Sequence, residues 1–109
     1  MTTKMTFNKD DVIIVKLVTG EEVIGTVSRK FVDGTIELAE TKAVLLNEIG
    51  CYMEQYIPFA VTQTYTFPSH AIVTVAIPIP ELLTFYHKKL SEGEPNGGIV
   101  SSLSSKTQH

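Results

Sequence analysis

The residue pair that first suggests chemistry is Ser69–His70, a hydroxyl directly beside an imidazole. Nucleophilic catalysis needs a serine and a base that meet side chain to side chain, and a third group that orients the base. Adjacent residues without that third group do not meet this requirement, so the pair predicts no catalytic centre. A binding role suits His70 better, because imidazole donates and accepts hydrogen bonds and contacts phosphate when protonated. The simpler alternative is a turn histidine bonded to backbone.

The other reactive side chains stand alone in the sequence. Cys51 is the single cysteine, which excludes an intrachain disulfide and favours a reducing compartment, and neither it nor His87 belongs to a group with metal-ligand spacing. Gly93, Gly97 and Gly98 follow a predicted helix, whereas a phosphate-binding loop precedes one. The sequence therefore predicts no enzyme, no metal, no cofactor and no small-molecule substrate.

The charge balance gives no general attraction to nucleic acid or to an anionic membrane. Lys and Arg number 9 against 12 Asp and Glu, for a formal net charge of −3. Any RNA binding must therefore come from a local patch. Arg29 and Lys30 beside Phe31 form one small basic-aromatic cluster in a predicted loop, although solvation alone explains most such clusters.

The length and the hydrophobic pattern indicate one soluble domain. At 109 residues there is room for a single core. The first residues, Met1–Phe7, lack the apolar stretch of a signal peptide, and no apolar run approaches the roughly 20 residues of a membrane helix. We expect a cytoplasmic protein that does not enter a membrane.

The elements that must position these residues are mostly strands. Alternation, β-branched residues and turn signals predict strands over residues 12–18, 22–28, 35–39, 61–67 and 70–77. Gly20 serves the turn between the first two strands, and Gly25 inside the second strand indicates a sharp bend. Leu82, Leu83, Tyr86 and Leu90 form an apolar stripe on a predicted helix over residues 80–90.

These elements predict an N-terminal arm over residues 1–11 and a β-barrel over residues 12–78. An insertion is expected at about residues 40–60. A C-terminal helix follows over residues 79–91, and residues 92–109 are rich in Ser and Gly, which predicts a disordered tail.

Two segments resemble the Sm/LSm/Hfq family. Residues 17–27 resemble the first Sm motif, with its apolar and glycine places held by Leu17, Gly20, Val23, Gly25 and Val27. Residues 69–75 resemble the closing strand of Hfq, where a lysine-histidine pair precedes an alanine-isoleucine-serine-threonine run. The resemblance implies a mainly β, Sm-like fold: a strongly bent, five-stranded, open antiparallel barrel, here with a C-terminal helix.

The resemblance also implies where RNA would bind. Family rings grip uridine through an asparagine on the third strand, and Glu37 takes that place here. His70 takes the place of the pore-facing histidine of Hfq, while Ser69 replaces the neighbouring lysine. The RNA-binding candidates are thus His70, Ser69, Glu37, Arg29 and Lys30.

An open sheet leaves two apolar edges, and their pairing between neighbouring copies would close a ring. The interface candidates lie on the last two predicted strands: Val61, Tyr65, Phe67, Ile72, Val73 and Val75. The sequence thus supports two hypotheses. The first is a ring that binds single-stranded RNA, and the second is a ring that serves as an assembly or adaptor scaffold without nucleic acid.

Overall fold

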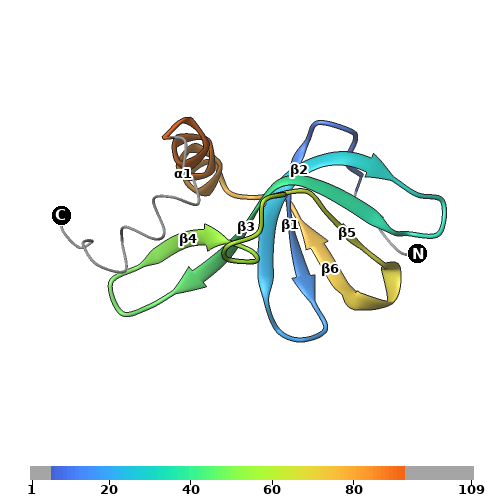
Figure 1. Ribbon diagram of the computed structural model, residues 1–109, viewed down its shortest axis with the longest axis horizontal. Coiled ribbons are helices and arrows are strands. Elements are labelled where there is room, and N and C mark those ends of the chain that lie inside the picture. Colours follow the sequence, from blue (N-terminus) through green and yellow to red (C-terminus); the bar gives the residue numbers. More distant parts are fainter. Residues whose placement is uncertain (1–5, 93–109) are drawn as a thin grey trace.

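The computed structural model describes residues 6–92 of the chain (Figure 1). The predicted arm is therefore described only from Thr6, and the predicted tail beyond Glu92 lies outside the described residues. The elements in chain order are β1 (Val12–Leu17), β2 (Glu22–Lys30), β3 (Ile36–Leu46), β4 (Cys51–Gln55), β5 (Tyr65–Phe67), the 3-10 turn η1 (Ser69–Ala71), β6 (Ile72–Ala76) and α1 (Pro80–Ser91).

All strands belong to one antiparallel sheet. Its order is β4-β3-β2-β1-β6, and β5 also pairs with β3. Because β4 and β5 pair with different halves of β3, they are two segments of one strand position, and the sheet has five positions across. The predicted fold class, an open antiparallel sheet of five positions with a C-terminal helix, is confirmed.

The line from β4 to β5 is interrupted by an excursion. Lys42 pairs with Gln55 and Leu38 pairs with Tyr65, so three residues of β3, 39–41, face nine residues of the opposite segment, 56–64. The region expected as an insertion, residues 40–60, thus contains the end of β3, a hairpin, β4 and only part of the excursion. The strand predicted over residues 61–67 is correspondingly short, because residues 61–64 belong to the excursion.

A sharp bend in β2 and β3 gives the sheet its curvature. Between the pairs Thr26–Ala39 and Ile24–Lys42, the single residue Gly25 faces two residues of β3. One of these two, Glu40, has a φ of 55°, so this is a β-bulge in a left-handed conformation. A Cβ on Gly25 would lie 2.9 Å from the Cβ of Leu38, which explains why glycine stands at the bend.

The bend wraps the sheet around one main core. Alternate residues of the strands point into the barrel, and the buried ones are Ile13, Val15, Leu17, Val23, Val27, Ile36, Leu38 and Phe67. Residues of the excursion and of β6 pack on this core from the open side, among them Tyr56, Ile72 and Val75. The β-branched composition of β1 and β2 suits this half-buried pleated surface.

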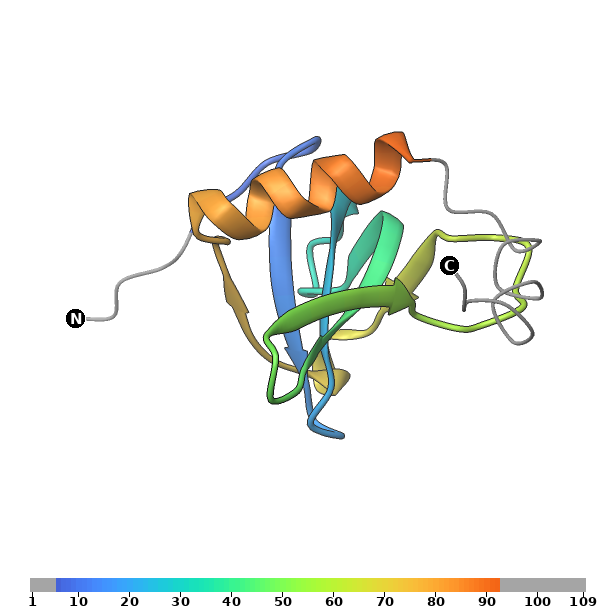
Figure 2. The same cartoon turned by 90° about the vertical axis from the view of Figure 1, so that its left-hand side faces the viewer.

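The helix covers the opposite face of the sheet (Figure 2). It begins at Pro80, where the sequence predicted the helix to start, and Lys88 and Lys89 lie in its last turn. A second cluster joins helix to strands through Ile24 and Met53 from the sheet and Tyr86 from the helix, with Leu82, Phe85 and Leu90 packed against them. The predicted stripe included Leu83, but Phe85 is the residue that packs in this cluster.

Tyr86 connects the helix to the bend. Its side chain is fully buried, and its hydroxyl donates a 2.9 Å hydrogen bond to the carbonyl oxygen of Glu40, the bulge residue. The single phenolic proton is used there, so the hydroxyl of Thr26 donates to the Tyr86 oxygen at 3.1 Å. The carbonyl that the bulge removes from the strand ladder is thus satisfied by the helix.

Within residues 6–92, the helix is too short and too polar to cross a membrane.

We predict that Tyr86→Phe lowers the free energy of unfolding by about 1–3 kcal/mol, because it leaves the Glu40 carbonyl without its donor. Urea denaturation followed by circular dichroism measures this change. The control is Tyr52→Phe, since Tyr52 on β4 is 38% exposed. Equal losses in the two variants would contradict a special role for Tyr86.

The same tyrosine predicts a pH dependence. Burial raises the pKa of Tyr86 from 10.0 to about 12. Between these values the unfolded chain has lost the phenolic proton while the folded chain retains it, so stability falls as pH rises through this window. The stability difference between wild type and Tyr86→Phe should therefore be constant below pH 10.0 and shrink toward pH 12. A difference that stays constant up to pH 12 would contradict this assignment.

Candidate functional site

The predicted RNA-binding residues gather at one end of the sheet. The turn between β2 and β3 lies against η1. A Cβ built on Gly34 would lie only 3.1 Å from the Cβ of Ser69. Glu37 of β3 lies opposite Arg29 on one side and Thr66 on the other. Gly34 and Ser69, which are 35 positions apart in the sequence (69 − 34), thus share one region of the surface.

Ser69 and His70 lie on the exposed turn η1. The turn is closed by backbone hydrogen bonds from Ala71 N to Pro68 O (2.9 Å) and from Ile72 N to Ser69 O. Within residues 6–92, no hydrogen bond joins the imidazole of His70 to another residue. The imidazole is therefore available to a ligand, and the simpler alternative, a histidine bonded to backbone, does not describe this turn.

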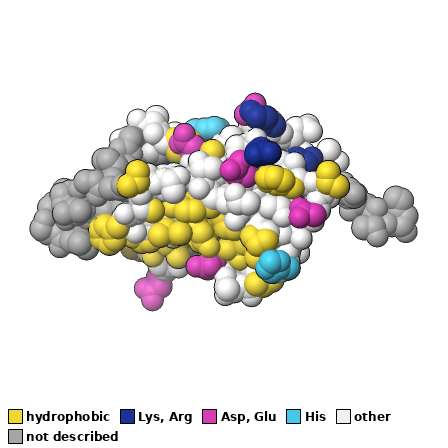
Figure 3. Space-filling view, turned by 45° about the vertical axis from the view of Figure 1, so that its right-hand side comes forward, with side chains coloured by type: hydrophobic (Ala, Val, Ile, Leu, Met, Phe, Trp, Pro, Cys, Tyr) yellow, Lys and Arg dark blue, Asp and Glu magenta, His cyan; other side chains and the backbone are white. Residues whose placement is uncertain are grey.

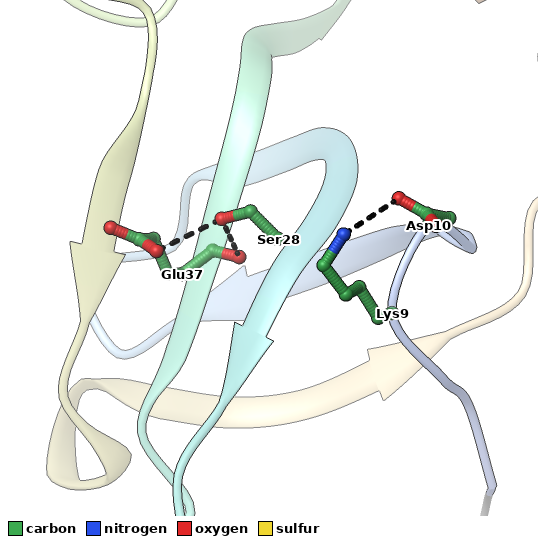
Figure 4. A network of polar contacts seen from close by, with 4 residues as sticks. All are labelled: Lys9, Asp10, Ser28 and Glu37. Carbon is green, nitrogen blue, oxygen red and sulfur yellow. Dashed lines mark hydrogen bonds and ion pairs between the residues drawn. The ribbon is translucent and has the colours of Figure 1, made fainter.

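Glu37 is half-buried and already engaged. The Ser28 hydroxyl lies 3.0 Å from Oε1 of Glu37 and 3.3 Å from its backbone carbonyl oxygen (Figure 4). Ser28 occupies a second bulge, in β2, between the pairs Val27–Leu38 and Arg29–Glu37. The carboxylate is thus fixed as a hydrogen-bond acceptor, and it cannot supply the donor that an asparagine amide supplies to a base.

The two cations of the site contact aromatic rings of their own chain. The guanidinium carbon of Arg29 lies 4.8 Å from the ring centre of Phe31. The ammonium of Lys30 lies 4.7 Å from the ring centre of Phe7 and also donates to the carbonyl oxygen of Phe7. Both charges remain exposed, but these contacts direct them toward the N-terminal arm and the β2–β3 turn. Sequence reasoning did not anticipate the part played by Phe7.

A further carboxylate, which sequence reasoning missed, lies on the β2–β3 turn. Asp33 Oδ1 accepts a 2.9 Å hydrogen bond from the backbone N–H of Thr35, and this bond lowers the pKa of Asp33. The sequence does not place this turn beside Ser69, because the contact between Gly34 and Ser69 depends on how the sheet bends. Because Asp33 and Glu37 accompany the two cations, the site offers hydrogen-bonding groups and little net positive charge.

The predicted interface residues divide between core and surface. Phe67 is 5% exposed and belongs to the barrel core, against which Tyr65, Ile72 and Val75 are packed. Val61 is 93% exposed but lies in the excursion and not on a strand. Val73 is 59% exposed, at the register shift where β6 leaves strict pairing with β1.

Among the described residues 6–92, no three His, Cys, Asp or Glu side chains are grouped as metal ligands.

No protein-family model matches the sequence, and no curated protein matches it. Among solved structures, the chain is similar to a heptameric archaeal Sm protein, with 14% identity and a TM-score of 0.46, over 65% of this chain and 88% of that one. It is also similar to a chain of the NatC complex bound to CoA, with 14% identity and a TM-score of 0.48, over 73% of this chain and 97% of that one. The open, bent antiparallel sheet with its C-terminal helix matches the Sm-like fold that the sequence motifs predicted, and at this identity the two similarities concern the fold alone.

We predict that two alanine substitutions separate the contact between the β2–β3 turn and η1 from the backbone strain that alanine causes at a glycine position. Gly34 and Gly20 have φ values of 95° and 100°, so alanine at either position strains the backbone, by about 1–3 kcal/mol. Only Gly34→Ala also presses on Ser69, since nothing lies within 4 Å of a Cβ on Gly20. Gly34→Ala should therefore lower the melting temperature more than Gly20→Ala, and it alone should shift the NMR signals of His70. Unchanged His70 signals would mean that the two turns do not touch.

Proposed function

We propose that this chain is the subunit of a homo-oligomeric Sm-like ring that serves as a protein assembly scaffold. The observation that carries the proposal is the pair of free strand edges. Within the described part of the chain, the outer edge of β6 and the outer edge of the β4–β5 line pair with no other strand. Unpaired edges expose backbone donors and acceptors and invite pairing with another chain.

Exposed apolar side chains accompany both edges. Val73 and Ile77 on and after β6 are 59% and 54% exposed, while Phe59 and Val61 in the excursion beside β5 are 61% and 93% exposed. Figure 3 shows hydrophobic side chains forming a continuous patch on one face of the molecule. Burial of such side chains favours association.

The two edges differ, so their mutual pairing is head-to-tail. A head-to-tail contact closes into a ring when the rotation between neighbours permits, and otherwise continues as a filament. The strong bend of the sheet sets the two edges at an angle, which supports closure. Copies of this chain are thus the partners that the proposal requires.

A scaffold role explains the charges better than an RNA role does. The candidate site combines the carboxylates of Asp33 and Glu37 with two cations that contact their own chain through Phe31 and Phe7. Phosphate binding depends on cations that replace counterions, and each carboxylate opposes it.

We predict that Val73→Asp converts the oligomer into monomer. An aspartate at the paired edge would be buried without a partner in the assembly, which is strongly unfavourable. Light scattering coupled to size-exclusion chromatography, at micromolar concentration, measures the mass. The matched control is Val32→Asp, because Val32 is fully exposed in the β2–β3 turn, away from both edges. A wild-type protein that is monomeric at that concentration, or equal effects of the two substitutions, would overturn the proposal.

A second candidate function, binding of single-stranded RNA, is favoured by one observation. The His70 imidazole is exposed and makes no hydrogen bond within residues 6–92. A ring would repeat this group around its axis, so that weak contacts add through multivalency.

We predict that any RNA binding is weak, with a shallow dependence of log K on log salt, because few phosphates are neutralised. Gel shifts with U-rich and A-rich oligonucleotides at two salt concentrations test this. His70→Ala should weaken binding while His87→Ala on the helix does not. Ser69→Lys should strengthen binding and steepen the slope, while Thr84→Lys on the helix should do so less. If neither wild type nor Ser69→Lys shifts any oligonucleotide at low salt, the RNA candidate is wrong and the scaffold candidate stands alone.

A further inference from the structure

A cavity of about 320 Å³ opens between the β1–β2 turn, the start of the excursion and β5. It borders η1, since Pro68 and Ala71 line it, but His70, Ser69 and Gly34 are not among its lining residues. Buried Leu17 and Phe67 form part of its lining, and Tyr56 and Tyr65 line it from the excursion side. Neither the ring nor the RNA candidate gives this cavity a role.

The aromatic residues of the cavity are arranged at steep angles to one another. The rings of Tyr56 and Tyr65 are 5.3 Å apart with an interplanar angle of 78°, and the rings of Tyr56 and Phe67 are 5.6 Å apart at 54°. The Tyr65 hydroxyl donates a 2.8 Å hydrogen bond to the carbonyl oxygen of Thr62, which fixes this wall. Tyr56 thus packs on both Tyr65 and Phe67, and the three rings together form one aromatic wall of the cavity.

A carboxylate completes the lining. Glu21 lies in the β1–β2 turn, where its Oε1 accepts a 2.9 Å hydrogen bond from the Thr19 hydroxyl. Within residues 6–92, the Glu21 carboxylate makes this one hydrogen bond, so its Oε2 remains available to a ligand. Burial raises the pKa of the Tyr56 hydroxyl, and the negative charge of Glu21 raises it further. The charge of Glu21 is therefore felt at the cavity wall.

We propose that this cavity binds an organic cation, namely an ammonium group carried on apolar carbon. Aromatic faces attract a cation through their quadrupoles, and a carboxylate on the same cavity adds direct attraction. An anion would meet Glu21, and a neutral apolar group would leave the carboxylate partly desolvated without a counter-charge. Such a cation has two sources of the same chemistry: a small quaternary ammonium ion, or a lysine side chain presented by a protein.

The cavity exists within one copy of the chain, so this proposal does not depend on ring formation. β5 nevertheless both lines the cavity and forms part of a free sheet edge. The experiment therefore records the binding of the cation and the mass of the protein separately, which keeps a failure of one proposal distinct from a failure of the other.

The test is a titration of the wild-type chain with tetramethylammonium chloride to about 10 mM, followed by the NMR signals of the tyrosine rings. A parallel titration uses Nα-acetyl-trimethyllysine amide, and the neutral reference for the first arm is tert-butanol, with sodium chloride correcting for ionic strength. We expect saturable shifts of the Tyr56 and Tyr65 signals, with the neutral compound about threefold to tenfold weaker. Tighter binding of the lysine derivative identifies a protein side chain as the source, and tighter binding of the small ion identifies a free ligand.

Matched variants assign the effect to the cavity. Glu21→Gln should weaken binding, whereas Glu22→Gln should not, because Glu22 is an adjacent glutamate paired with Lys16 at 3.3 Å. Tyr56→Leu should abolish binding, while Tyr52→Leu preserves it. If Tyr56→Leu does not fold, the Tyr65 signals of the Glu21→Gln variant still decide whether the cation binds in the cavity. Absence of saturable shifts in both titrations, or equal binding of tert-butanol and tetramethylammonium, would overturn the proposal.

Discussion

The structure depends on the bend at which Gly25 of β2 faces the bulge residue Glu40 of β3. The bend turns the two halves of β3 in different directions. β4 pairs with one half and β5 pairs with the other. The bulge releases the Glu40 carbonyl from the ladder, and the buried hydroxyl of Tyr86 restores its hydrogen bond at 2.9 Å. The C-terminal helix is therefore part of what holds the curvature, in addition to covering the outer face of the sheet.

The curvature determines both what is brought together and what is left open. It sets the β2–β3 turn against η1, so that Gly34 and Ser69 touch, and it directs alternate strand residues into one enclosed core. The sheet does not close on itself, since β6 and the β4–β5 line end as free edges. Enclosed core and open edges thus have one origin, and a second copy of the chain is the simplest way to cover the edges.

Much of this fold could be predicted from local sequence signals. The β-branched runs, the turn at Gly20 and the bend at Gly25 all act within a few residues, so they are readable without the tertiary structure. The helix was predicted with its ends nearly correct, but Phe85 replaced Leu83 in the packed stripe, because the direction of the stripe depends on how the helix lies on the sheet. The excursion at residues 56–64 was misplaced, since only the pairing of β3 with two separate segments defines it.

The candidate sites were less predictable than the fold, because they are formed by contacts between distant turns. The role of Phe7 beside Lys30, and the contact of Gly34 with Ser69, depend on the bend and have no local signature. The same holds for the cavity between Glu21, Tyr56 and Tyr65, whose residues come from three segments. Since β5 borders this cavity and also ends the sheet, cation binding and ring assembly would share one strand. By linkage, the factor by which the cation changes the assembly constant equals the factor by which assembly changes the affinity for the cation. A cation that favours assembly must therefore bind more tightly to the assembled form, and one that opposes assembly must bind it less tightly.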